Sequence, residues 1–259
     1  MAHSSKKIGA VQRAVDILNL FDSASPELGT TEIAKALGLH KSTAASLVYT
    51  LEANGYLTQN PNSRKYRLGF KLLERANSVL DHIDVREIAL PWLRQLHDEC
   101  GETVNLGILD GADVVYIESL LSTRVLGMHS KVGKRTPAHS AALGKAILGF
   151  LPLQDAREYI AQYGLPAMTP NTISDSTKFL QELERVREQG FAIDDEENEL
   201  GGRCVAAPIF DHEGNPALAL SISVPSARLS LADVPQLAAR VLHVAKTISH
   251  SLGYMPRPF

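Results

Sequence analysis

The sequence predicts a two-domain protein of the α/β (α+β) class, with a small domain in residues 1–80 and a larger one in residues 81–259. Three observations support this prediction. Apolar residues recur at helical spacing in short segments up to residue 54, and a hairpin pattern follows them. Helical spacing continues through residues 69–99, which we interpret as a linker. From residue 103 onward, strand-like runs alternate with helical segments, which favours a sheet with helices packed on its faces.

The composition is that of a globular protein with a packed core. Hydrophobic residues make up 44% of the 259-residue chain and charged residues 21%. No apolar run approaches the ~18 residues of a membrane span, and the N-terminus lacks the apolar segment of a secretory signal. Cys100 and Cys204 stand in different contexts and make no disulfide framework. We therefore expect a cytoplasmic protein with reduced thiols and no membrane contact.

The net charge of −3 hides an asymmetry between the two parts of the chain. Residues 1–75 carry ten Lys or Arg and six Asp or Glu, a net charge of +4. The remaining residues carry 16 basic and 23 acidic side chains, a net charge of −7. A basic first third joined to an acidic remainder indicates that only the first third meets a polyanion such as nucleic acid.

Three short helices are predicted in the first domain. Residues 8–21 should form a helix with one buried apolar stripe. The stripe consists of Val11, Val15, Leu18 and Phe21. After the loop DSASPELG, the segment TEIAKALG is typical of a helix that Thr30 can cap and Gly38 ends. The next helix runs from about Lys41 to Asn54, so the last two helices make a helix-turn-helix.

A short hairpin follows these helices. Residues 56–58 and 65–68 have strand-like composition, and the segment NPNS supplies the turn between them. A hairpin after a helix-turn-helix is a wing. Arg64, Lys65 and Arg67 lie on it, within reach of phosphates if the preceding helix enters a groove.

Two linker helices and a mixed domain complete the chain. The linker helices are expected over residues 69–82 and 84–99, where Pro91 should kink the second helix or mark its true start. TVNLGILDG and DVVYIESL form a hairpin with a tight Asp110-Gly111 turn, and a long loop over residues 120–140 follows. Further strands are FAID, CVAAPIF and ALALSISV. Further helices are expected over residues 141–151, 153–163, 175–189 and 230–252.

The helix that begins at Lys41 has an unusual first part. Lys41, Ser42, Thr43 and Ser46 supply one cation and three hydroxyls, although hydroxyls compete for the helix backbone. Ser42 and Thr43 can simply cap the helix. Short polar side chains at the start of a recognition helix can also approach phosphates and base edges in the major groove. Together with the preceding helix, the wing and the charge asymmetry, this composition favours DNA binding.

An ordered set of motifs runs through both domains. EIAKALGLHKST, TLEANGYL and YRLGFKLLE occur in the first, and GETVNLGILDG, TPAHSAALGKAILGFLP, GFAIDDEEN, LGGRCVAAPIFD and LSISVP in the second. From about Val11 to Gly253 this set resembles the IclR family of bacterial transcriptional regulators. The resemblance implies a winged helix-turn-helix, a linker helix and a GAF-like effector-binding domain. It also implies a homodimer or homotetramer on a palindromic operator in double-stranded DNA, and a repressor of a catabolic operon.

The resemblance implies a set of DNA-contacting residues in the first domain. The set is Thr31, Lys41, Ser42, Thr43, Ala45, Ser46, Tyr49, Arg64 and Lys65. The family pattern usually has a basic residue where this chain has Ser46, and Ala45 is small as well. We therefore expect this chain to depend more on its wing and on dimer geometry, with half-sites ~34 Å or a multiple apart.

The resemblance also implies an effector pocket in the second domain. Its residues are Val125, Met128, Ala142, Leu143, Asp194, Cys204, Ser221 and Ser223. Ser221 and Ser223 alternate by two and therefore point to one face of a strand. Hydroxyls and the N–H groups at the start of the helix near Ala141 suit a small carboxylate, and the apolar members suit its carbon skeleton. The alternative is that Cys204 and the serines merely fill the interior.

The acidic run DDEENELGGRC over residues 194–204 offers oxygen ligands for a cation but lacks the spacing of an EF-hand. We expect no metal and no cofactor, and interpret most of these acids as a solvated strand end.

Two other functions stay open at this point. Cys204 is the candidate nucleophile of a cysteine-dependent enzyme, with His129, His139 or His212 as its base. However, Cys204 opens an apolar strand, where a thiol is normally inert. The other alternative is an architectural nucleic-acid-binding protein without a ligand, against which the large acidic second domain argues.

Overall fold

The computed structural model of the chain describes residues 8–22, 25–80 and 84–255. Contacts divide the chain into two compact units, Met1–His82 and Ile83–Phe259. The predicted boundary between residues 80 and 81 adjoins residues 81–83, which lie outside the described residues. In the described part of the chain, no helix is both long and apolar enough to cross a membrane.

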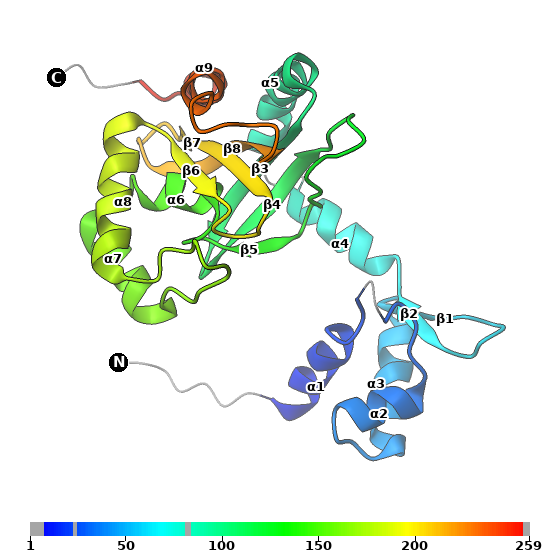
Figure 1. The fold of residues 1–259 in the computed structure, drawn as a ribbon. Helices are drawn as coiled ribbons and strands as arrows, with labels where there is room; N and C mark the ends of the chain where they lie inside the picture. The colour runs from blue at the N-terminus through cyan, green and yellow to red at the C-terminus, as the bar shows by residue number, and fades with distance from the viewer. Residues whose placement is uncertain (1–7, 23–24, 81–83, 256–259) are drawn as a thin grey trace. The chain divides into compact units, whose positions relative to one another are not determined.

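The first unit is a helix-turn-helix followed by a hairpin (Figure 1). Its elements are α1 (Gly9–Leu18), α2 (Thr30–Ala36), α3 (Lys41–Ala53), β1 (Leu57–Gln59), β2 (Tyr66–Leu68) and α4 (Lys71–Leu80). β1 and β2 pair antiparallel, and Leu28 forms an isolated bridge to Tyr66 that borders the hairpin. The predicted winged helix-turn-helix is confirmed.

An apolar core holds the three helices and β1 together. The residues at its centre are Ile17, Ile33, Ala44, Val48 and Leu57. The predicted stripe on α1 is wrong in part, because Val11 and Val15 are 58% and 45% exposed. α1 buries Ile17 instead, which places the edge with Val11 and Val15 outside this core.

The start of α2 also differs from the prediction. Thr30 is the first helical residue, and Gly29 precedes it as the N-cap. The Gly29 N–H donates to Glu32 Oε2 over 2.6 Å, so the Glu32 carboxylate rather than the Thr30 hydroxyl pairs with the backbone here. α3 ends where predicted, since Gly55 follows Asn54 with a φ of 76°, which glycine adopts without strain.

The second unit is a six-stranded antiparallel sheet with helices on both faces (Figure 1). The strands are β3 (Thr103–Asp110), β4 (Asp113–Leu120), β5 (Arg135–Pro137), β6 (Ala192–Asp195), β7 (Gly202–Phe210) and β8 (Pro216–Pro225). The helices are α5 (Asp84–Cys100), α6 (Ala142–Leu148), α7 (Leu153–Tyr163), α8 (Ser176–Gln189) and α9 (Val234–Ser251). The strand order is β5-β4-β3-β8-β7-β6. α5 and α9 cover one face, and α6 to α8 lie on the other.

Two elements of this unit depart from the sequence expectation. β5 lies in the segment predicted as a loop, because its three residues pair with β4 at the sheet edge. α5 continues through Pro91, so the proline does not mark the helix start. The buried residues Ala89, Leu93 and Leu96 share one side of α5, and this packing outweighs the hydrogen bond that proline cannot make.

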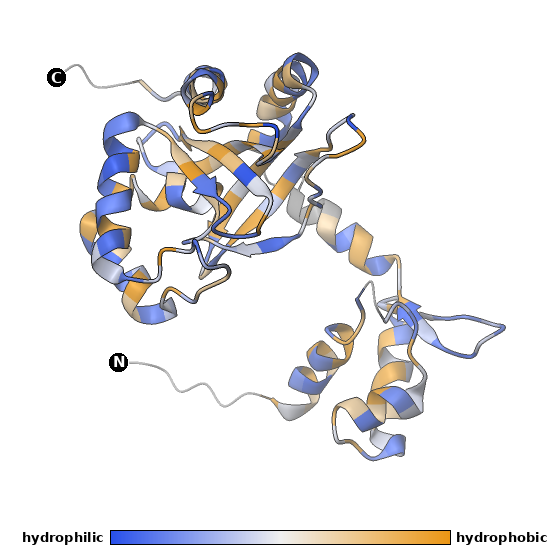
Figure 2. Ribbon diagram, viewed as in Figure 1, coloured by the Kyte–Doolittle hydropathy of each residue, from blue (hydrophilic) through white to orange (hydrophobic). Residues whose placement is uncertain are grey.

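The alternation of side chains along the central strands gives one apolar face and one face, here called the polar face, that carries polar groups among buried alanines. Val205 pairs with Ile222, and both are fully buried. Their neighbours Cys204, Ser221 and Ser223 point to the opposite face, beside α6. Figure 2 shows the resulting mixture, in which hydrophilic positions interrupt largely hydrophobic strands.

A glycine lets α6 lie close to the segment that precedes it. A Cβ atom at Gly144 would be 2.1 Å from the carbonyl oxygen of Ala138, closer than any side chain can come. Gly144 therefore fixes the position of α6 over the polar face of the sheet.

Candidate functional site

α3 presents a buried face to the core and an exposed face to solvent. Ala44 and Val48 are buried. The exposed residues of the helix include Lys41, Ser42, Ala45, Ser46 and Tyr49. These five positions recur three or four residues apart and so share one face. The predicted DNA-contacting residues of α3 thus lie together, except Thr43, which is half-buried; Thr31 is exposed on α2.

Neither Ser42 nor Thr43 caps α3. The N-cap is His40, and no side chain makes a capping hydrogen bond there. Ser46 Oγ donates to the Ser42 carbonyl over 3.1 Å, as Thr50 Oγ1 does to the Ser46 carbonyl over 2.9 Å. Ser42 and Ser46 are therefore exposed residues, and neither they nor the half-buried Thr43 cap the helix.

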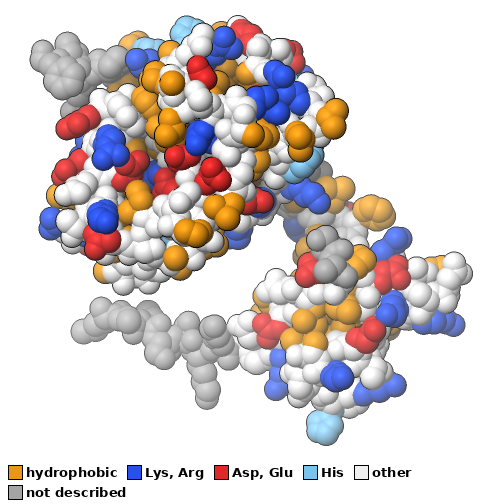
Figure 3. All heavy atoms as spheres, viewed as in Figure 1, with side chains coloured by type: hydrophobic (Ala, Val, Ile, Leu, Met, Phe, Trp, Pro, Cys, Tyr) orange, Lys and Arg blue, Asp and Glu red, His pale blue; other side chains and the backbone are white. Residues whose placement is uncertain are grey.

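The wing carries three basic residues in two different situations. Lys65 Nζ forms an ion pair with Glu32 Oε1 of α2 at 2.9 Å. Among the described residues, Arg64 and Arg67 form no ion pair and both are exposed. Figure 3 shows Lys and Arg side chains at the surface of this hairpin. Of the two predicted wing contacts, Arg64 is therefore the freer cation.

A carboxylate shapes the tip of the wing. Glu27 accepts hydrogen bonds from Asn60 Nδ2 at 2.8 Å and Ser63 Oγ at 3.0 Å, which lower the pKa of Glu27. Arg64 has a φ of 56°, which directs the chain back into β2. The turn is thus fixed by side-chain contacts, which leave Arg64 at its exposed end.

In the second unit, a small polar cavity lies between the sheet and the start of α6. Its volume is about 40 Å³, room for a few water molecules or a compact ligand. Seven of the eight predicted effector residues line it: Met128, Ala142, Leu143, Asp194, Cys204, Ser221 and Ser223. The structure does not bring Val125 to it, because that side chain is fully exposed.

Nine further residues line the cavity and are not in the predicted effector set, although the helix start near Ala141 is part of that prediction. They are Asn105, Tyr116, His129, Ser130, Lys134, Ala141, Asn198, Glu199 and Gly202. Asn105 carries a signal that sequence reasoning can use, since it is one polar residue within the apolar strand run TVNLGIL. The others come from strand β4, the loop after it, the start of α6, and the turn between β6 and β7 with the start of β7, and only the folded sheet brings these segments together.

Asn105 is the centre of a buried hydrogen-bond network in the cavity wall. Its Nδ2 donates to Ser223 Oγ over 3.2 Å, and Cys204 Sγ donates to the same oxygen over 3.1 Å. The Oδ1 atom of Asn105 accepts from Ser119 Oγ over 2.9 Å and from Ser130 Oγ. Strands β3, β4, β7 and β8 thus present linked polar groups toward one small space.

Asp194 lies at the end of β6 and is only 5% exposed. Its Oδ1 accepts from the N–H of Glu197 at 2.8 Å and from the N–H of Asn198 at 3.2 Å. Burial raises the pKa of Asp194 to about 7, against the lowering effect of these N–H groups and of Lys145. The carboxyl therefore changes protonation near neutral pH. Burial also raises the pKa of Tyr116 to about 12, so its phenol keeps its proton.

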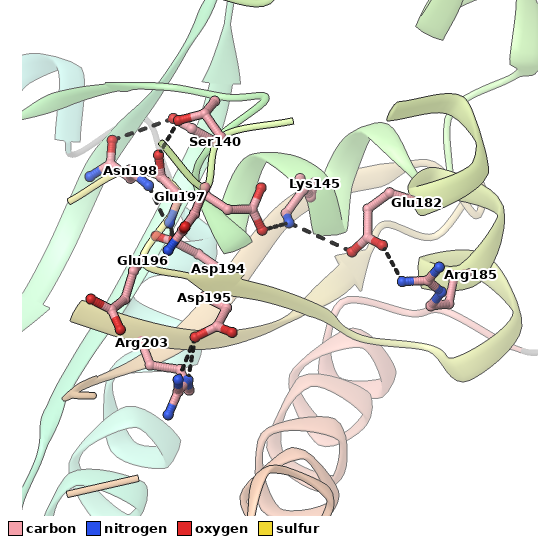
Figure 4. Close-up of polar contacts among 12 residues, drawn as sticks. Ser140, Lys145, Glu182, Arg185, Asp194, Asp195, Glu196, Glu197, Asn198 and Arg203 are labelled. Atoms are coloured by element: carbon pink, nitrogen blue, oxygen red, sulfur yellow. Dashed lines mark hydrogen bonds and ion pairs between the residues drawn. The ribbon is translucent and has the colours of Figure 1, made fainter. Parts of the chain in front are cut away.

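The acidic run is not simply a solvated strand end, and that expectation is wrong for Asp194 and Glu197. Glu197 is 7% exposed and pairs with Lys145 Nζ of α6, which is fully buried (Figure 4). Asp195 binds Arg203 at 2.5 Å. Each of these carboxylates has its own protein partner, and among the described residues no group of three His, Cys, Asp or Glu is placed to hold a metal ion.

Both units match known protein families. Residues 10–61 match the model described as the IclR helix-turn-helix domain, and residues 77–250 match the model described as bacterial transcriptional regulator IclR C-terminal. The chain belongs to the IclR family. It is 40% identical to the HTH-type transcriptional regulator XynR of Escherichia coli K12, over 95% of this chain and 98% of the relative. It is 30% identical to the transcriptional repressor IclR of the same strain, over 98% and 93% of the two chains.

The fold of the IclR family recurs in solved structures. An IclR homologue of Microbacterium hydrocarbonoxydans, crystallised with 4-hydroxybenzoate, has a TM-score of 0.82 over 94% of this chain and 99% of its own, at 22% identity. At this identity the likeness concerns the fold. With the family models, it establishes the two-domain architecture of a helix-turn-helix domain and a C-terminal α/β domain.

IclR-family proteins are transcriptional regulators, so this chain is a DNA-binding regulator, and the alternative of a Cys204 enzyme is wrong. The local chemistry agrees. Burial and the nearby Asp194 raise the pKa of Cys204, which keeps its thiol protonated and unreactive. Its hydrogen bond goes to Ser223, and His139 binds the Pro166 carbonyl at 2.9 Å instead of the thiol.

Proposed function

We propose that this regulator is a repressor whose operator binding is controlled by a small organic acid in the cavity of the C-terminal domain. The observation that carries the proposal is the assembly of seven predicted effector residues around one polar space. One of the two E. coli relatives is named a transcriptional repressor, and this name supports repression. We propose a catabolic operon as its target.

The cavity chemistry favours a compact acid with hydroxyl or carbonyl groups. Ser221, Ser223 and Asn105 supply polar hydrogen-bonding groups, and Lys134 supplies a cation. Ala142 and Leu143 supply an apolar wall for a short carbon skeleton. Asp194 opposes an anion only when ionised, and a pKa of about 7 lets it accept a proton at small cost as the acid binds.

The DNA-reading surface is proposed to be the exposed face of α3 together with the wing. Lys41 and Arg64 would contact phosphates, and Ser42, Ser46 and Tyr49 lie where a recognition helix meets base edges. The pairing of Lys65 with Glu32 positions the wing against α2 and weakens Lys65 as a phosphate ligand.

We also propose that the active form is at least a homodimer. Val11 and Val15 of α1 and its N-cap residue Ile8 are exposed, and Phe70 and Leu73 are exposed near the start of α4. Large apolar side chains gathered on a small domain indicate a surface that another chain covers. A second copy of this chain would pair two recognition helices on a palindromic operator. Effector binding would then change the separation of the two helices and so the affinity for DNA.

The effector proposal is tested by thermal unfolding of the protein with a panel of acids: glycolate, glycerate, pyruvate and 4-hydroxybenzoate. We expect at least one acid to raise Tm by mass action on the folded state. Ser221→Val should abolish that shift, because it removes a hydroxyl from the cavity wall and adds bulk.

A matched control is Val125→Ala, which alters the one predicted effector residue that lies outside the cavity. Its acid-induced shift should equal that of the wild-type chain. A panel without effect on the wild-type chain, or an equal shift in the Ser221→Val variant, contradicts the proposal.

A further inference from the structure

A buried ion cluster joins α6, α8 and the turn after β6. Lys145 of α6 is 0% exposed, and its Nζ contacts Glu197 Oε1 and, at 3.6 Å, Glu182 Oε1 of α8. Glu182 Oε2 in turn accepts from Arg185 Nη1 at 2.8 Å (Figure 4). One ammonium thus stands between two carboxylates, and among the described residues only Glu182 has a second cation as partner.

Glu197 links this cluster to the effector cavity through its own backbone. Its N–H donates to Asp194 Oδ1, and the next N–H, of Asn198, donates to the same oxygen. Asp194, Asn198 and Glu199 all line the cavity, whereas Lys145 does not. Lys145 therefore contacts, on the side away from the cavity, the turn that supplies Asn198 and Glu199 and that binds Asp194.

A second anchor holds the carbonyls of the same turn. Thr169 Oγ1 donates to the Glu196 carbonyl at 2.7 Å, and Thr172 Oγ1 donates to the Glu197 carbonyl at 2.6 Å. These bonds restrain the backbone but leave the Glu197 side chain to Lys145. Glu196 has a φ of 60°, which a residue with a side chain adopts only when its surroundings impose it.

We propose that Lys145 is a positioning residue of the effector site, acting through Glu197 to hold the turn that carries Asn198 and Glu199 and whose N–H groups bind Asp194. The proposal rests on the proposed effector function of the cavity. Glu197 Oε2 is buried and makes no hydrogen bond within the described part of the chain, so the Lys145 contact is what orients this carboxylate. A charged pair fixes direction, which an apolar contact of the same volume does not.

The test compares two variants of the full-length protein. Lys145→Met combined with Glu197→Met removes both charges and replaces them with apolar chains, because the single Lys145 variant leaves a buried carboxylate unpaired. The control is Glu182→Gln, which removes the other carboxylate beside the same ammonium without touching the turn.

Amide hydrogen exchange needs no ligand and is the first readout. Relative to strands β7 and β8, the Glu197 and Asn198 amides of the double variant should lose protection by about tenfold or more. The control should match the wild-type chain. Equal protection of these two amides in the double variant overturns the proposal.

Binding of the four panel acids, by calorimetry, is the second readout. The double variant should bind the active acid about tenfold more weakly or worse, while Glu182→Gln keeps the wild-type Kd. Wild-type affinity in the double variant overturns the positioning role. If no acid binds the wild-type chain, the effector proposal fails, and the exchange result still decides whether Lys145 holds the turn.

Discussion

The two units of this regulator place their functional polar groups in opposite environments. On the first unit, Lys41, Ser46 and Arg64 are exposed on an ordinary helix and hairpin. In the second, Asp194 and Lys145 are buried beside the polar face of a sheet. Exposed charges act almost independently and are screened by salt, whereas buried charges act as a set and depend on burial and pH. Charged side chains of the first unit are therefore expected to respond mainly to salt, and those of the second unit mainly to pH.

The largest effect that separates the two environments is the pH dependence caused by Asp194. Its pKa is about 7 when folded, above the value near 4 of an exposed carboxyl, so its contribution to stability is full below about pH 4 and is lost between about pH 4 and 7. Asp194→Asn keeps an acceptor for both N–H groups and removes the titration. We expect this variant to exceed the wild-type chain in free energy of unfolding by up to about 4 kcal/mol at pH 8, and to match it at pH 4. Denaturant titrations at both pH values measure the difference, and a constant difference would show that Asp194 does not titrate as described.

The next effect concerns packing around the cavity. Gly144→Ala places a Cβ against the Ala138 carbonyl and should cost about 3 kcal/mol of unfolding free energy, by forcing α6 away from its place. Gly29→Ala, in the first unit, meets only the flexible end of Glu32 and should cost less than about 1 kcal/mol. Chemical denaturation of both variants measures these costs. Equal costs would contradict the close packing of α6 against the Ala138 carbonyl.

A smaller effect is expected for the exposed basic residues of the wing in the first unit. Arg64→Ala combined with Arg67→Ala should weaken binding to any duplex by about tenfold and lower the slope of log K against log salt by about 2. Lys65→Ala is the matched control and should change the slope less, because its Nζ is already paired with Glu32. Fluorescence anisotropy over a salt series decides between them. A larger loss of salt slope for Lys65→Ala than for the double arginine variant would show that Lys65, and not the two arginines, is the main phosphate contact of the wing.

The smallest effect is a gain of affinity. Ser46→Arg puts a cation on the exposed face of α3, so DNA affinity should rise severalfold and the salt slope by about 1. The same anisotropy series measures it, and an unchanged slope would mean that this face does not meet the duplex.

The sequence predicts the first unit better than the cavity of the second unit. The first unit is local in sequence, so apolar spacing, Gly55 and the turn NPNS were enough to predict α2, α3 and the wing. Its errors were at edges: the stripe of α1, where Val11 and Val15 are exposed, and the cap of α2, where Glu32 replaces Thr30. Apolar spacing shows that one side of a helix is apolar, but it does not show whether the same chain or another chain covers that side.

The cavity is assembled from distant segments and was only partly predictable. Ser221 and Ser223 followed from strand alternation, but the roles of Ser130, Asn198 and Lys145 depend on a register that pairs β3 with β8 and β7 with β6. An acidic run looks solvated in a sequence, but in the fold Glu197 is buried against Lys145 and Asp194 is buried against the N–H groups of the following turn. Burial of charge is a tertiary property, and sequence patterns carry little of it.

The central claim is that an acid in the cavity changes the affinity of the N-terminal domain for DNA. The direct measurement is Kd for a duplex selected in vitro from random sequence, with and without each panel acid, for the wild-type chain and Ser221→Val. We predict equal affinities without acid, and with acid a change of at least about fivefold for the wild-type chain only. An equal change in both proteins, or none in either, would contradict the account.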